Sequence, residues 1–164
     1  MQLDPRIKLS PRSVLQQSQV EMRLAGLLSR SSEDVLQARS VLEQIGRLGP
    51  KLGALKDQAD RVAAQVTALL AGPKPNTARA PTLRDVNASI ATLYGVIQVD
   101  AQPTAAQLTE TTKTETTATA LAGTWTKLKT GELATLDAAL KAAGLPEIRP
   151  ELRPMLHPTH SNEE

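Results

Sequence analysis

The sequence predicts an all-α protein, an antiparallel helical bundle of five or six helices. The chain of 164 residues has one Trp, one Tyr and no Phe, so its core must be built from Leu, Val, Ile and Ala. Leu and Ala favour helices, whereas sandwiches and barrels depend more on aromatic and β-branched residues. Apolar residues also recur at steps of three and four, which is the period of an amphipathic helix.

The length predicts one domain with a single core. Hydrophobic residues make up 40% and charged residues 22% of the chain, so most of it is expected to fold. The expected parts are an N-terminal arm (1–9), a helical bundle (10–148) made of a hairpin (10–72), a loop (73–81) and further helices (82–144), and a flexible C-terminal tail (149–164).

The first half of the chain predicts a helical hairpin. Ser10 and Pro11 have the pattern of an N-cap followed by proline at the first helical position, so a helix is expected over 11–30. Ser31–Ser32 either begins a second helix over 32–48 or lies on the exposed stripe of one uninterrupted helix, and Gly49–Pro50 ends it. The apolar face of the first helix is expected to comprise Val14, Leu15, Met22, Leu24, Ala25, Leu27 and Leu28.

The second half predicts a helix over 82–99 and another over 104–129. Eight threonines lie between Thr104 and Thr119, and their β-branching disfavours helix. This segment is either a helix held by tertiary packing, which we favour, or a disordered and O-glycosylated linker. A new helix is expected to begin around Gly131 and to end at Gly144.

The expected core is taken from the apolar residues at helical spacing. Trp125 shares a stripe with Leu121 and Leu128, so we interpret it as a core residue and not as part of a binding site. The predicted core is Leu24, Leu28, Leu42, Ile45, Leu55, Val62, Val66, Leu69, Val86, Ile90, Leu93, Leu121, Trp125, Leu136 and Leu140.

No catalytic, cofactor-binding or metal-binding residue is predicted. The chain has no Cys, no glycine-framed serine and no phosphate-binding loop, and its seventeen carboxylates fall mostly on solvated helix faces or in the tail. His157 and His160 are three residues apart, but Pro158 disfavours the helix that would bring them together and no third ligand is evident. We therefore expect no metal, no cofactor and no enzymatic activity of this chain.

Composition also argues against several partners. The net charge of +2 is scattered, and two isolated aromatic rings cannot stack an extended single strand, so no nucleic-acid partner is expected. No segment approaches the roughly 18 apolar residues of a membrane span, and the first residues lack the apolar core of a signal peptide. Membrane insertion is therefore not expected.

The order of the helices and of their end motifs resembles a known family. The motifs are Leu9–Pro11, Met22–Leu24, the Asp100–Thr104 turn, Trp125–Leu128 and the run from Leu133 to Pro146. They resemble the C-terminal helical region of large bacterial secreted proteins that have a sortilin-like β-propeller with neuraminidase-type repeats and are often labelled glycosyl hydrolases. The similarity covers most of residues 9–148.

This resemblance implies a supporting role and no catalysis by this chain. No blade-sized strand repeat is present, so the substrate site of the family has no counterpart here and no catalytic residue is carried over. The expected function is a non-catalytic accessory or docking module that supports or caps a propeller, with an extracellular or periplasmic location. The alternatives are a fragment of a glycosyl hydrolase whose propeller lies elsewhere, and a free-standing helical oligomerisation or adaptor protein.

Overall fold

A computed structural model describes residues 11–72, 80–99 and 103–152, and all of the regular structure in these ranges is helical. The fold class predicted from the sequence is therefore confirmed for this part of the chain. The α-helices are α1 (Pro11–Leu48), α2 (Lys56–Ala71), α3 (Leu83–Val99), α4 (Ala105–Leu128) and α5 (Ala134–Ala142). Two 3-10 turns, Gly49–Lys51 and Gly53–Leu55, join α1 to α2, and a π turn, Lys129–Leu133, joins α4 to α5.

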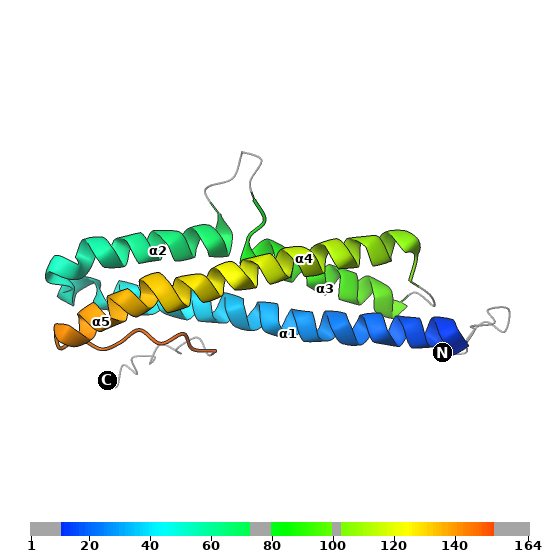
Figure 1. Cartoon of the computed structure of the whole chain (residues 1–164), viewed down its shortest axis with the longest axis horizontal. Helices are drawn as coiled ribbons and strands as arrows, with labels where there is room; N and C mark the ends of the chain where they lie inside the picture. The colour runs from blue at the N-terminus through cyan, green and yellow to red at the C-terminus, as the bar shows by residue number, and fades with distance from the viewer. Residues whose placement is uncertain (1–10, 73–79, 100–102, 153–164) are drawn as a thin grey trace, which may run out of the picture.

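The helices form an elongated bundle (Figure 1). Helix α1 runs along its whole length, while α2 and α3 lie end to end beside it and run in the opposite direction. Helix α4 and its continuation α5 run along both shorter helices, in the same direction as α1. Each half of the molecule is thus built from three helical rods.

The expected count of five or six separate helices is not supported in the described residues, where four long helices pack against one another. Ser31–Ser32 does not interrupt α1, because the Ser31 hydroxyl donates to the Leu28 carbonyl of the preceding turn (3.1 Å) instead of capping a new helix. The break expected around Gly131 is also absent, because the backbone passes through it as a π turn. Helices α4 and α5 are therefore one continuous rod.

The threonine-rich segment is helical, as favoured from the sequence. Thr104 caps α4: its hydroxyl accepts from the Gln107 amide (3.2 Å), and the Gln107 side chain accepts from the Thr104 amide (2.6 Å). Threonine hydroxyls along α4 then donate to the carbonyl four residues earlier, which satisfies them within the helix. These are Thr109, Thr111, Thr112, Thr116, Thr117, Thr119 and Thr124.

The interior consists of two clusters, whereas the sequence predicted a single core. One cluster joins the C-terminal half of α1 to α2, the end of α4 and α5, and it contains Trp125. The other joins the N-terminal half of α1 to α3 and the first part of α4, and it contains Ile90. Leu121 packs against both clusters. The division follows from the chain, because the partner of α1 changes from α2 to α3 halfway along the bundle.

Most of the predicted core packs into one of these clusters. Nine of its fifteen residues are buried, and the other six, Leu28, Leu42, Leu55, Leu69, Leu93 and Leu121, are partly buried against a cluster. Val20, which was not in the predicted core, is buried although four polar residues precede it. The predicted core also left out Ile148, which is buried beyond the last helix because its amide donates to the Asp137 carboxylate (2.8 Å).

Other predictions fall outside the described residues. They concern the arm 1–9, the Ser10 cap, most of the loop 73–81, and His157 and His160 in the tail.

Candidate functional site

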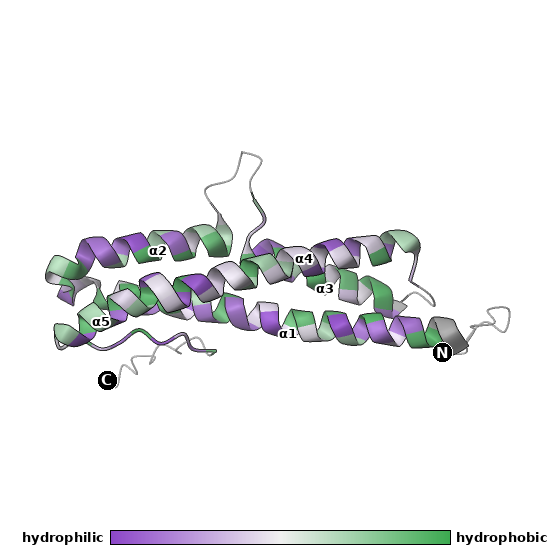
Figure 2. Cartoon of the chain, in the orientation of Figure 1, coloured by the Kyte–Doolittle hydropathy of each residue, from purple (hydrophilic) through white to green (hydrophobic). Residues whose placement is uncertain are grey.

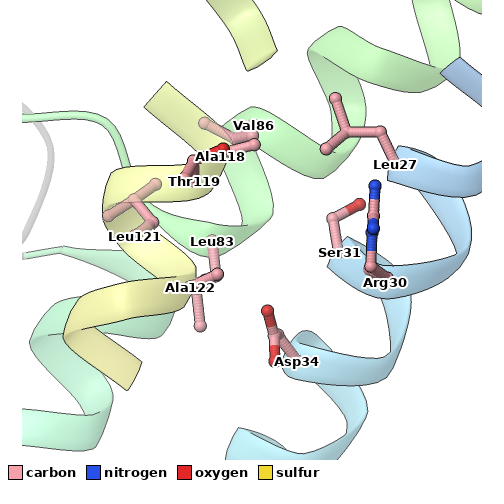
Figure 3. A pocket seen from close by; sticks show the side chains of 10 residues that line it. All are labelled: Leu27, Arg30, Ser31, Asp34, Leu83, Val86, Ala118, Thr119, Leu121 and Ala122. Carbon is pink, nitrogen blue, oxygen red and sulfur yellow. The ribbon is translucent and has the colours of Figure 1, made fainter. Parts of the chain in front are cut away.

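A cavity of about 260 Å³ opens at the waist of the bundle, where the two clusters meet (Figure 3). It lies between the middle of α1, the first turn of α3 and the middle of α4. The cavity exists because α2 ends and α3 begins at this level, so no regular helix fills the third corner. Its lining is Leu27, Arg30, Ser31, Asp34, Leu83, Val86, Ala118, Thr119, Leu121 and Ala122.

The polar side of the cavity comes from α1. Arg30, Ser31 and Asp34 face it across from the apolar side chains of α3 and α4 (Figure 3). Ser31 is already bonded, because its hydroxyl accepts from the Asn87 side chain (2.9 Å). Burial raises the pKa of the Asp34 carboxyl above its usual value, while the positive charge of Lys129 acts in the opposite direction.

The cavity lacks the groups that hydrolysis of a glycoside requires. Asp34 is the one carboxyl among the lining residues, whereas that reaction uses two carboxyls that face each other across the sugar. Among the described residues, no three His, Asp or Glu side chains are gathered where they could hold a metal ion. The cavity is therefore a small, mostly apolar space with one cation and one anion at its edge.

The second feature is an exposed face of α1 at the opposite end from α5. We call it the outer stripe: Leu15, Ser18, Gln19, Met22, Ala25, Gly26 and Ser29, all of which are exposed. The side chains of Leu15 and Met22 are 64% and 65% exposed, and they lie two helical turns apart on one side of the helix. Both residues had been assigned to the buried face of the first helix.

That assignment was wrong because α1 has two apolar faces in this region. Val20 and Leu24 are buried against α3 and α4, and a helix that turns 100° per residue places Leu15 and Met22 on the opposite side. Val14, exposed at 47%, and Ala25 also lie outside the core. The spacing of seven between Leu15 and Met22, out of phase with Val20 and Leu24, indicates in the sequence that two apolar faces exist, but not which of them is buried.

The outer stripe carries no charge. Only two of the sixteen residues from 14 to 29 are charged, compared with six of the eighteen residues from 30 to 47. The two are Glu21 and Arg23, and both are turned away from the stripe. The Glu21 carboxylate accepts from Gln17 (3.0 Å), whose side chain also donates to the Ile97 carbonyl of α3. Arg23 forms a two-pronged ion pair with Glu115 of α4, donating from Nε at 3.0 Å and from Nη2 at 2.7 Å. One charge is thus held toward α3 and the other toward α4.

The chain itself covers the continuation of this face at Ser40 and Gln44, whereas Glu33, which lies between them and the outer stripe, is exposed. Ser40 lies eighteen residues after Met22, which is five helical turns, yet Ser40 is only 4% exposed. The Gln44 side chain binds the backbone of Arg149, donating to its carbonyl (2.6 Å) and accepting from its amide (3.0 Å). The described part of the segment after α5, residues 143–152, therefore lies along the C-terminal half of α1 (Figure 1) and does not reach the outer stripe.

Hydrophobic and hydrophilic residues alternate along every helix (Figure 2). No helix in the described ranges is long and apolar enough to span a membrane.

Comparisons with protein-family models, with curated proteins and with solved structures found no match to this chain. The resemblance to the helical region of sortilin-like propeller proteins therefore stays a prediction.

Proposed function

We propose that this chain is a non-catalytic helical docking module, and that it binds its partner through the outer stripe of α1. The observation that carries the proposal is the distribution of exposed large apolar side chains. Of the five in the described residues, Val14, Leu15, Met22 and Val96 lie at the same end of the bundle, and Leu152 lies apart. The bond from Gln17 to the Ile97 carbonyl places Val96 beside this part of α1.

Apolar side chains that are exposed to water carry a free-energy cost, and docking to a partner removes it. Contiguous apolar surface on a soluble protein commonly marks an interaction site, because contact with a partner takes it out of water. The absence of charge on the outer stripe supports the same conclusion, since charged residues are depleted at the centres of protein interfaces. The resemblance described above implies a β-propeller as the partner, while the alternative of a free-standing oligomerisation protein implies another copy of this chain.

A photo-crosslinking experiment tests the proposal. Met22 is replaced by a photoreactive amino acid in cells that make the protein, and cross-linked products are identified by mass spectrometry. Gln65, exposed on α2 in the other half of the bundle, is the matched control. We expect a discrete product from position 22 and none from position 65. Equal labelling from both positions, or none from position 22, would contradict docking through α1.

A further inference from the structure

We infer that the outer stripe of α1 pairs with the same stripe of a second copy of this chain, in antiparallel orientation about Met22. This inference rests on the proposed docking function and names the partner. It is drawn from the order of large and small side chains along the stripe, from the absence of charge on the stripe, and from the segment that covers Ser40 and Gln44 farther along α1.

The stripe is complementary to itself when it is reversed. An antiparallel pair with its two-fold axis at Met22 places Leu15 opposite Ser29 of the second copy, so Leu15 meets a small side chain, while Met22 meets its own copy at the axis. On one flank Gln19 lies beside Gly26 of the second copy, and on the other Ser18 lies beside Ala25. Because Ser18, Ala25 and Gly26 are small, the Leu15 and Met22 side chains have room between two helices at the ordinary separation of about 8–10 Å.

A symmetric pair is the usual arrangement for a surface that is complementary to itself. A charged side chain near the two-fold axis would lie opposite its own copy, and the two like charges would repel each other. The stripe avoids this repulsion. Glu21 and Arg23 are the charges closest to Met22 in sequence, and the contacts with Gln17 and Glu115 hold them away from the axis.

The covered half of α1 excludes a parallel pair. In a parallel pair the outer faces of both α1 helices would have to meet along their whole length, including Ser40 and Gln44. There the backbone of Arg149 already lies on Gln44, and it would separate the two helices. In the antiparallel pair only the N-terminal halves overlap, and the covered halves point away from each other.

The expected affinity is low. The stripe from Leu15 to Ser29 is about 21 Å long at 1.5 Å per residue. One helix face of this length buries less than the roughly 800 Å² per partner of a stable interface. We therefore expect a reversible dimer with Kd on the order of 100 µM, so the chain is monomeric when dilute.

Cysteine cross-linking tests the register, because the chain has no native cysteine. Met22→Cys places two thiols at the two-fold axis, where a disulfide can form. Leu15→Cys places them about 21 Å apart, beyond the roughly 7 Å that a disulfide spans between Cα atoms. We expect rapid dimer formation by the first variant, slow formation by the second, and rapid formation again in a mixture of Leu15→Cys with Ser29→Cys. Gln65→Cys measures the rate of random collision.

Sedimentation of the 164-residue chain gives the second measurement. The dimer fraction should rise with concentration, and Met22→Glu should abolish it, because two carboxylates would then meet at the axis. Circular dichroism of this variant should be unchanged, since Met22 is exposed. A Leu15→Cys disulfide that forms as fast as that of Met22→Cys, or a monomer at all concentrations, would overturn the inference. A monomer whose position 22 cross-links to a different protein overturns self-pairing alone, whereas a monomer with no cross-link overturns the docking function as well.

Discussion

The indole nitrogen of Trp125 donates a hydrogen bond to the side-chain oxygen of Gln37, at 3.1 Å between α4 and α1. Trp125 is fully buried, so this bond satisfies a donor that water cannot reach. The same Gln37 oxygen accepts from the Lys129 ammonium at 2.9 Å, and that ammonium lies 5.3 Å from the centre of the Trp125 ring. One glutamine therefore joins the two long rods of the bundle at its largest core side chain.

Replacement of Gln37 by Met should destabilise the fold. The variant keeps the length of the side chain but leaves the Trp125 donor buried without an acceptor, which costs about 1–3 kcal/mol. Urea denaturation followed by fluorescence gives the free energy of unfolding, since Trp125 is the only tryptophan. Gln65→Met on the exposed face of α2 is the control, and equal stability of the two variants would show that the bond contributes nothing.

The helical character of the chain could be predicted because periodicity and composition agree along most of it. The predicted stripe of Leu83, Val86, Ile90, Leu93 and Ile97 shows this, since four of the five residues are buried and Leu93 is partly buried against the same helices. Helix ends were less predictable, because Ser31 and Gly131 are residues that also end helices elsewhere. Whether they do so depends on tertiary contacts, such as the bond from the Asn87 side chain to the Ser31 hydroxyl, that no local pattern contains.

Both features of the candidate site were beyond local sequence reasoning. The cavity arises from two helices that meet end to end, and its lining comes from segments up to about a hundred residues apart. The outer stripe was hidden because Leu15 and Met22 have the composition of core residues. Only the packing of Val20 and Leu24 shows which face of α1 is turned inward.

Two glycine replacements should have opposite effects. Gly144 ends α5 with φ +69°, while the Leu145 amide bonds to the Leu140 carbonyl (2.9 Å) and the Gly144 amide to that of Lys141 (3.1 Å). Alanine is strained in this left-handed conformation, so Gly144→Ala should lower stability by about 1 kcal/mol. Gly123 lies within α4 with open space around it, so Gly123→Ala should raise stability by about 0.5–1 kcal/mol. Thermal unfolding of both variants checks the sign of each change.

The segment after α5 should be released by a single replacement. Gln44→Ala removes both bonds to the Arg149 backbone, so the Ile148–Arg149 segment should open more often. We expect faster cleavage after Glu147 by a glutamate-specific protease and faster amide exchange at Ile148 and Arg149. Gln65→Ala serves as the control. Unchanged cleavage in Gln44→Ala would mean that burial of Ile148 alone holds the segment.

Stability should depend on the ionisation of Asp34. Because burial raises the pKa of this carboxyl in the folded state, the folded protein retains its proton at a pH where the unfolded chain has lost it. Asp34 therefore contributes favourably to folding stability at a pH below its pKa in the unfolded chain. This contribution is lost as the pH rises through the higher pKa of the folded state. Asp34→Asn, which resembles the neutral acid, should be slightly more stable than the parent at pH 7 and lose that advantage near pH 3. A parent advantage at pH 7 would show that attraction to Lys129 dominates.

The π turn between α4 and α5 should be removable without loss of packing. Thr111, Ala118 and Trp125 are buried at intervals of seven, as are Leu133 and Leu140, but eight residues separate Trp125 from Leu133. The π turn absorbs the extra residue and keeps Leu133 and Leu140 in phase with Trp125. Deletion of Gly131 should therefore leave a regular α-helix with every core residue in place, and stability at or above that of the parent.

Deletion of Gly123 is the matched control, because it removes the same residue type from the regular part of α4. All later residues then rotate by about 100°, and even if the π turn relaxes to restore Leu133 and Leu140, Trp125 stays out of phase. Exposure of a buried tryptophan should cost about 3–5 kcal/mol and shift its fluorescence emission to longer wavelength, while deletion of Gly131 leaves the emission unchanged. If both deletions shifted the emission alike, the extra residue would not be what keeps the two halves of this helix in phase.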